Sequence, residues 1–254
     1  MAKSYVNTET FILPSKGRVY SKQISPSIEL RSMTTEDEEK RLRTTATPNK
    51  LLSELIEGCI VGEKPAIHVY DMCLGDFNFL LHKLRLVTYG SEYKMDVTCP
   101  HCRQHSIMTA DLDSLEVNEY DDSIENDKVI ELPVTGKKIT LKMNTPRDID
   151  EINARVAEIR KRAPESIIDP TFKVSLQFMI DLIDGEKPSP LALEKFITGL
   201  PMRDANYLRQ KSAVYNGKVG LNTEIAVKCS NDQCGFEFLT SFRYGDEFFR
   251  PTVD

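Results

Sequence analysis

Two pairs of cysteines, far apart in the chain, have the spacing of metal ligands. Cys99 and Cys102 enclose Pro-His, while Cys229 and Cys234 enclose four residues and are followed directly by a glycine. Zinc in structural sites takes four ligands in a tetrahedron, and two cysteines separated by two to four residues can direct both sulfurs inward from one tight loop. Each pair therefore supplies half of a four-coordinate shell, and we expect the four sulfurs to hold one structural Zn²⁺ ion.

A redox dithiol can show the same spacing as Cys99 and Cys102, so one pair alone would be weak evidence for a metal. A thioredoxin-like pair, however, opens a helix within a βαβ unit, whereas both pairs here lie between segments that alternate apolar and polar residues. Catalytic zinc also needs an open position for water, and four thiolates close the shell. The pattern therefore favours a structural site.

Two histidines near the first pair leave the ligand set open. Either His101 or His105 could replace one sulfur, because zinc accepts both cysteine and histidine, or could lie at the surface without a ligand role. Free cysteine is among the most frequently buried side chains, which predicts core positions for the two cysteines that have apolar neighbours. The side chains expected in the core or at the surface without a metal role are Cys59, Cys73, His68 and His82.

The segments on either side of each cysteine pair predict β-hairpins. Tyr93, Met95 and Val97 alternate with polar residues before the first pair, and Ile107 follows it. The segment TEIAVKCSNDQCGFEFLTSF repeats this pattern around the second pair. Alternation with a period of two is typical of strands, so each pair is expected at the tip of a hairpin. A further hairpin is predicted within 129–143, and the acidic segment 118–127 is expected to be a solvated loop.

Apolar side chains at helical spacing, bounded by cap residues, prolines and glycines, predict a series of helices. Asp76 is a natural N-cap for the third of them and Gly90 a stop. The ranges expected to be helical are 34–43, 48–60, 74–89, 145–163, 169–185, 189–200 and 201–217.

One shared metal ion would bring residues near 100 and residues near 230 together, so everything between them becomes an insertion. The predicted fold class is therefore α+β, with β-hairpins that form a zinc ribbon and an N-terminal arm with helices. We call the turn around each cysteine pair a knuckle, and a helical insertion is expected over about 145–215 between the two knuckles. The expected division is an extended arm over 1–32, a helical and zinc-ribbon body over 33–117 and 221–254, and an inserted hairpin and helical subdomain over 118–220.

Composition and motifs narrow the classes of function. The net charge of −6 gives no general attraction to phosphate backbones, which makes nucleic acid an unfavourable partner. No segment has the apolar length of a membrane span and the first residues lack a signal peptide's apolar region, so the chain is expected to remain in a cytoplasm. The motifs GxxxxGK[ST], GxGxxG, GxSxG and HExxH are absent, so the sequence indicates no enzyme of these classes.

An ordered series of phrases resembles the T-even-type bacteriophage baseplate hub family. The phrases are FILPSKGRVY, LRSMTTEDEEKRL, LLSELIEGCI and YDMCLGDFNFLLHKLRLVTYGSEYKMDVTCPHC, and they cover residues 11 to about 117. The most specific part is LGDxxFLLxxLRxxxYGxxY running into CPxC. One departure is Arg103, which stands after Cys102 where the resemblance leads us to expect glycine.

The resemblance implies a non-enzymatic protein that builds or forms part of the hub of a phage tail baseplate. It implies phage baseplate hub and tail proteins as partners, and a location in the host cytoplasm during assembly, with the virion baseplate as the location of a protein that stays in the particle. Exposed apolar residues in the tail FRYGDEFFRP would suit docking, although Phe248 and Phe249 could equally be packed on the body.

Two alternatives come from other classes. The first is a zinc-ribbon nucleic-acid-binding factor, which would show salt-dependent retention of DNA or RNA. The second is an enzyme with a site between the hairpins and the helical insertion, for which the sequence indicates no catalytic residue.

Overall fold

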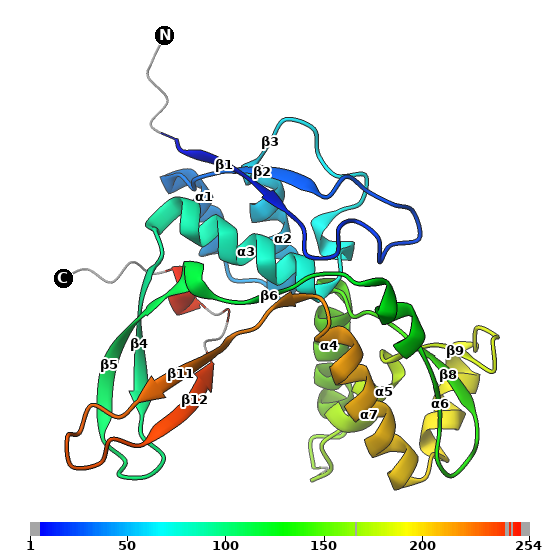
Figure 1. Cartoon of the computed structure of the whole chain (residues 1–254). Helices are drawn as coiled ribbons and strands as arrows, with labels where there is room; N and C mark the ends of the chain where they lie inside the picture. The colour runs from blue at the N-terminus through cyan, green and yellow to red at the C-terminus, as the bar shows by residue number, and fades with distance from the viewer. Residues whose placement is uncertain (1–5, 166, 242–243, 245, 250–254) are drawn as a thin grey trace.

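The computed structural model of the chain describes residues 6–165, 167–241, 244 and 246–249. A small sheet and three helices form one end of the molecule, two β-hairpins extend from it on one side, and a lobe of helices with a second small sheet lies on the other (Figure 1). Helices and antiparallel sheets occur together, so the predicted α+β class is confirmed.

The predicted N-terminal arm contributes two strands to the first sheet. Strands β1 (Thr8–Ile12), β2 (Ser27–Arg31) and β3 (Ile60–Val61) pair antiparallel in the order β1-β2-β3. Phe11 packs edge-on against Phe79 with ring centroids 6.4 Å apart. The arm is therefore extended and is also part of the hydrophobic core; its buried apolar side chains are Phe11, Leu13, Ile24, Ile28 and Leu30.

Helices α1 (Thr35–Arg41), α2 (Pro48–Cys59) and α3 (Leu74–Tyr89) agree with the predicted ranges. Thr34 caps α1 in a capping box with Asp37, which satisfies two amides at the helix start. Gly90 ends α3 with φ 83°, a conformation that a residue with a side chain rarely adopts. The two cysteines without a pair, which are in or beside these helices, are buried: Cys59 and Cys73.

The predicted cap role of Asp76 is wrong, because Cys73 occupies the N-cap position of α3. Asp76 is fully buried, and its carboxylate accepts hydrogen bonds from the amide and hydroxyl of Ser15 and from the hydroxyl of Tyr20. Burial raises the pKa of Asp76, although the bonds from Ser15 and Tyr20 oppose that change. The carboxylate therefore ties the LPSKG phrase to α3.

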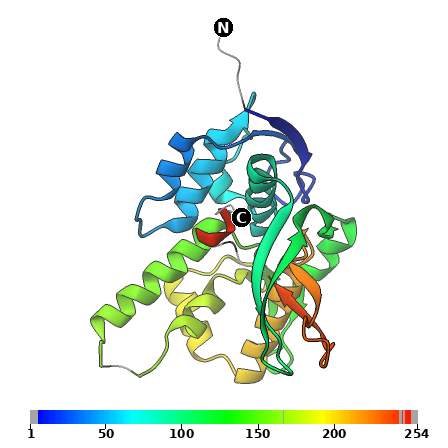
Figure 2. The same ribbon diagram turned by 90° about the vertical axis from the view of Figure 1, so that its left-hand side faces the viewer.

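Both predicted hairpins around the cysteine pairs are confirmed. Strand β4 (Glu92–Thr98) pairs with β5 (His105–Asp111), and β11 (Glu224–Lys228) pairs with β12 (Glu237–Ser241). Figure 2 shows the two hairpins side by side. One face of each joins the core that surrounds α3; the buried side chains from these faces are Met95, Val97 and Val227.

The remaining lobe begins and ends at one pair of short strands, β6 (Val117–Asn118) and β10 (Gly220–Leu221). Its sheet has the order β7-β8-β9, with β7 (Val129–Glu131), β8 (Lys138–Leu141) and β9 (Ile180–Ile183). The helices of the lobe are α4 (Pro146–Arg162), α5 (Thr171–Gln177), α6 (Pro190–Thr198) and α7 (Met202–Asn216).

The predicted helix over 169–185 is wrong in its second half. Helix α5 ends at Gln177, and Ile180–Ile183 forms β9, which pairs with β8. A short apolar run fits a helix and a buried strand equally well, and here the unpaired backbone edge of β8 decides between them. The acidic segment 118–127 is also more than a simple loop, because Asp122–Asp127 forms a 3₁₀ helix in which Ile124 is buried.

The end of the described chain packs on the body. Phe248 and Phe249 are 0% and 2% exposed, so the packed alternative is correct for these two rings. The buried guanidinium of Arg85 donates to the carbonyl of Phe248 at 2.8 Å and to those of Gly90 and Glu92. The other tail residues that were expected to be exposed, except Tyr244, lie outside the residues whose side chains are described. Among the described residues, no helix combines the length and apolar character needed to cross a bilayer.

Candidate metal centre

The two cysteine pairs are presented by turns that end in the same way, although the second turn is two residues longer. In the first, the amide of Arg103 donates to the carbonyl of Cys99, and Arg103 has φ 60°. In the second, the amide of Gly235 donates to the carbonyl of Asn231, and Gly235 has φ 55°. The residue after the second cysteine is thus left-handed in both turns. The sequence explains this left-handed conformation only in the second turn, because glycine adopts it at little cost in free energy.

The four sulfurs form one compact cluster. The Sγ atoms of the two pairs all lie within 4.8 Å of one another, although the pairs are more than a hundred residues apart in sequence. Cys99 Sγ is 3.9 Å from Cys234 Sγ, and Cys102 Sγ is 3.5 Å from Cys229 Sγ. A tetrahedron with Zn–S bonds of about 2.3 Å has edges of about 3.8 Å. The spacing therefore fits a tetrahedral metal and exceeds the roughly 2.05 Å of a disulfide.

Backbone amides favour negative charge on part of this cluster. The amide of Cys102, with burial acting in the opposite direction, lowers the pKa of the Cys99 thiol to about 7. The pKa of Cys229 is raised to about 12 although the amide of Asn231 lowers it, because burial and the thiols of Cys102 and Cys99 disfavour a second thiolate. Four thiolates at this spacing repel one another, so a bound cation is what allows all of them to ionise.

The two histidines left open by the sequence lie outside the cluster of sulfurs. His101 Nδ1 is 3.5 Å from Cys234 Sγ, and its ring stacks on Phe236 with centroids 5.4 Å apart. His105 is exposed on β5, with Nε2 3.9 Å from Asp96. The four grouped donors are all sulfur. Tetrahedral sulfur sites suit zinc or iron, and a closed shell has no position for a reacting water.

Asn231 is a structural residue of this centre that the sequence analysis did not single out. Its carbonyl accepts from the amides of Cys234 and Gly235, and its side-chain oxygen accepts from the amide of Gln233 at 3.0 Å. An asparagine that bonds to the backbone two residues later is a recognised turn signal, so the sequence did contain this information.

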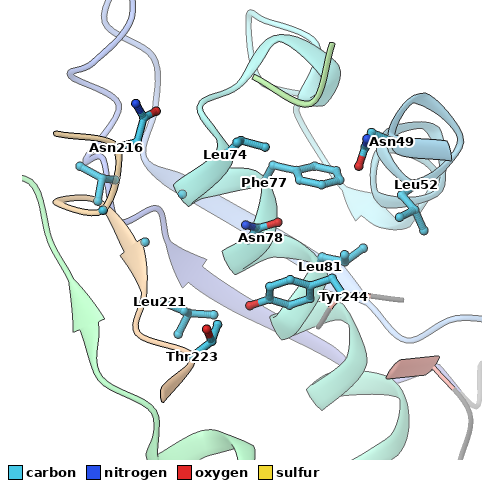
Figure 3. Close-up of a pocket in the computed structure, with 14 residues that line it drawn as sticks. Asn49, Leu52, Leu74, Phe77, Asn78, Leu81, Asn216, Leu221, Thr223 and Tyr244 are labelled. Carbon is cyan, nitrogen blue, oxygen red and sulfur yellow. The ribbon is translucent and has the colours of Figure 1, made fainter. Parts of the chain in front are cut away.

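A separate cavity of about 550 Å³ lies where α3 meets the strand that returns from the lobe (Figure 3). Asn49, Asn78, Asn216 and Thr223 supply polar groups, and Tyr244 is the single ionisable side chain among its described lining residues. Burial raises the pKa of Tyr244, which makes the phenol a poor proton acceptor near neutral pH. The described lining thus contains no carboxylate, histidine or cysteine for the alternative of an enzyme.

The fold and the site define an α+β protein whose two distant hairpins meet at a cluster of four cysteines with the spacing to hold one metal ion. The chain belongs to the family described as T4 bacteriophage base plate protein, whose model matches residues 6–250. The expected baseplate family is thereby confirmed, and the match extends well beyond the N-terminal phrases that suggested it. Comparison with curated proteins and with solved structures found no match.

Family membership makes this chain a phage baseplate protein and indicates a location in the tail, with other structural proteins of the phage as partners. A family of structural baseplate proteins also favours a role without catalysis.

Proposed function

We propose that the chain is a non-enzymatic structural or assembly protein of the baseplate hub, acts by docking onto hub and tail proteins, and carries one structural Zn²⁺ on Cys99, Cys102, Cys229 and Cys234. The observation that supports the metal is the single cluster formed by four sulfurs from two distant hairpins. The family match supports the baseplate role. The step from baseplate to hub is supported by the resemblance of the phrase that runs from Leu74 into the first cysteine pair.

The zinc proposal is tested by elemental analysis of the purified chain and of Cys99→Ser and Cys234→Ser. We expect one zinc per wild-type chain and loss of zinc and of folding in both variants, because metal affinity contributes directly to the free energy of folding. Cys59→Ala is the matched control, since Cys59 is buried away from the cluster, and it should retain one zinc. Loss of zinc in only one serine variant would contradict a site shared by both knuckles.

The hub proposal is tested with tail intermediates from a phage that lacks this chain. Purified chain added to such an extract should restore baseplates and should be found with their central hub components during assembly in the host cytoplasm. Restoration of peripheral parts alone would contradict the hub, and no restoration would contradict a role in baseplate assembly. Whether the protein then stays in the virion is read from the finished particles.

We also propose that 118–220 is an inserted subdomain, with 1–32 as the arm and with 33–117 and 221–254 as the body. The ends of the insertion support this division, because Asn118 pairs with Gly220 across β6 and β10. A short glycine linker can therefore replace the segment. The shortened chain should still bind zinc and unfold cooperatively; an unfolded or zinc-free product would contradict the division.

A further inference from the structure

Helix α7 has a solvent-facing side on which every charged residue is positive. Its exposed charged side chains are Arg203, Arg209 and Lys211. Its single acidic residue, Asp204, is fully buried and accepts hydrogen bonds from the amides of Val134 and Thr135 and from the Thr135 hydroxyl. The carboxylate of α7 is therefore engaged inside the lobe and forms no ion pair with the cations of the outer face, although it attracts the adjacent Arg203.

The three cations of α7 contact aromatic rings or solvent. Arg209 lies over the ring of Phe172 at 5.9 Å, and Lys211 lies over that of Tyr207 at 5.5 Å. In the part of the chain that the structure describes, no ion pair within 4.0 Å joins Arg203, Arg209 or Lys211 to a carboxylate, and the neighbouring carboxylate of Asp204 attracts Arg203 only at longer range.

Helix α4 provides the contrast within the same lobe. The exposed arginines of its C-terminal half are paired: Arg155 with Glu151, Arg160 with Asp169 at 3.0 Å, and Arg162 with Glu158. The chain as a whole carries a net charge of −6. The exposed side of α7 is thus a local group of cations without ion pairs on a negatively charged chain. Such a group attracts a surface of opposite sign.

The composition of the face favours an acidic protein over a nucleic acid. Met202 and Val214, near the two ends of α7, are 61% and 58% exposed, and the amides of Asn206 and Gln210 lie on the exposed side between them. Apolar and amide groups among the charges are typical of protein interfaces. Stable non-specific binding to a phosphate backbone usually draws on more cations than three, and the net charge opposes it.

We propose that the exposed face of α7 docks onto a carboxylate-rich surface of a neighbouring baseplate protein. This inference rests on the proposed function, because it names the surface through which the chain would dock. The three cations supply long-range attraction and orientation, and the apolar groups beside them are covered on contact. Such an interface weakens as salt concentration rises, since exposed charges are screened within about 10 Å at 0.1 M salt.

The test uses the triple variant Arg203→Glu, Arg209→Glu and Lys211→Glu of the full chain, added to extracts of cells infected by a phage that lacks the chain. We measure the amount of labelled chain that sediments with baseplates at low and moderate salt. Incorporation of the variant should fall by about tenfold or more, and that of wild type should fall as salt rises. Arg203→Lys with Arg209→Lys, which keeps the charge, should incorporate as wild type.

The matched control reverses the same number of charges on α4, as Arg155→Glu, Arg160→Glu and Arg162→Glu, and should change incorporation less than the α7 variant. Zinc content and the circular dichroism spectrum establish that each variant is folded. A neutral α7 variant, with the three cations changed to Gln, replaces the reversal if that chain does not fold. Selection for phages that tolerate the α7 reversal should yield Asp→Lys or Glu→Lys changes in another tail protein.

Unchanged incorporation of a folded α7 variant would overturn the inference and leave the proposed function intact. The inference would be equally wrong if nuclease treatment released the chain, because the partner would then be nucleic acid. Failure of wild-type chain to join any baseplate particle would instead contradict the proposed function itself.

Discussion

The carboxylate of Asp150 in α4 accepts hydrogen bonds from both the backbone amide and the side-chain amide of Asn49 at the start of α2, at 3.3 and 2.8 Å. The same carboxylate accepts from the amide of Lys50 at 3.0 Å and from the hydroxyl of Tyr70 at 3.0 Å. Thr47, the N-cap residue of α2, makes no side-chain cap of its own. A residue of the lobe therefore caps a helix of the body, a hundred positions away in sequence.

Asp150→Asn is expected to lower the free energy of unfolding by about 1–3 kcal/mol. The substitution replaces a charged acceptor of helix-terminal amides with a neutral amide, and it brings two unwanted donors to a position that is 1% exposed. Glu151→Gln, one residue further along α4 and exposed, should change stability by less than about 0.5 kcal/mol. Urea denaturation measures both; equal effects of the two substitutions would show that the cap contributes nothing.

Protonation of His82 in the unfolded chain should lower the free energy of unfolding in mild acid. The His82 ring is 1% exposed, with Nε2 2.9 Å from the carbonyl of Leu112, and burial lowers its pKa to about 4. The unfolded chain binds a proton near pH 6.5 while the folded chain resists it, so stability is full above that pH and declines as pH falls toward 4. We expect this side chain to account for a loss of about 2–3 kcal/mol between pH 7 and pH 4.5.

Comparison of wild type with His82→Gln isolates this contribution, because acid also protonates the cysteine cluster and the carboxylates in both proteins. The difference in unfolding free energy between the two should shrink or reverse as the pH falls. His68→Gln is the control for loss of an imidazole at an exposed position. A constant difference between wild type and His82→Gln at all pH values would contradict the assignment to His82.

Two Gly→Ala substitutions should have opposite signs. A Cβ atom at Gly75 in α3 would lie 2.2 Å from the carbonyl oxygen of Val219, where the returning strand crosses the helix. Gly58 in α2 has nothing within 4 Å of that position. Gly75→Ala should therefore cost about 1–3 kcal/mol or more, whereas Gly58→Ala should stabilise by about 0.5–1 kcal/mol. Thermal unfolding distinguishes the two variants. A Gly75→Ala protein as stable as wild type would mean that α3 and the strand at Val219 can move apart at little cost in free energy.

Local sequence patterns were sufficient for the hairpins, for most helices and for the identity of the four clustered cysteines. The alternation around Met95 fixes a strand because the period differs from that of a helix, and the spacing of Cys99 and Cys102 limits the turn to a few shapes. Such features depend on residues within one turn or one strand, which a single sequence displays directly.

Features set by distant partners were missed. Ile180–Ile183 becomes a strand because β8 presents an open edge, and Asp76 turns inward because Ser15 and Tyr20 donate to it. In the sequence, Asp150 likewise looks like an ordinary acidic residue of an amphipathic helix. Its role depends on the neighbouring helix α2, whose Asn49 donates to its carboxylate. A propensity or a period carries no information on such partners, which are brought together by tertiary packing.

The two knuckles should respond oppositely to substitution at their equivalent left-handed positions. Arg103 has φ 60° and bears a side chain that disfavours that conformation, while Gly235 has φ 55° and bears none. Arg103→Gly should therefore stabilise the metal-loaded protein by about 0.5–1 kcal/mol after the added freedom of the unfolded chain is counted, and Gly235→Ala should destabilise it by about 1 kcal/mol. Arg103→Ala keeps the strained backbone and is expected to be nearly neutral, which separates the backbone effect from loss of the guanidinium.

Thermal unfolding gives the stabilities, and competition with a zinc chelator gives the affinities, which should move in the same order because folding and metal binding are coupled. If Arg103→Gly and Gly235→Ala both weakened zinc binding, the turn at Arg103 would not be the counterpart of the turn at Gly235, and the side chain of Arg103 would itself stabilise the centre.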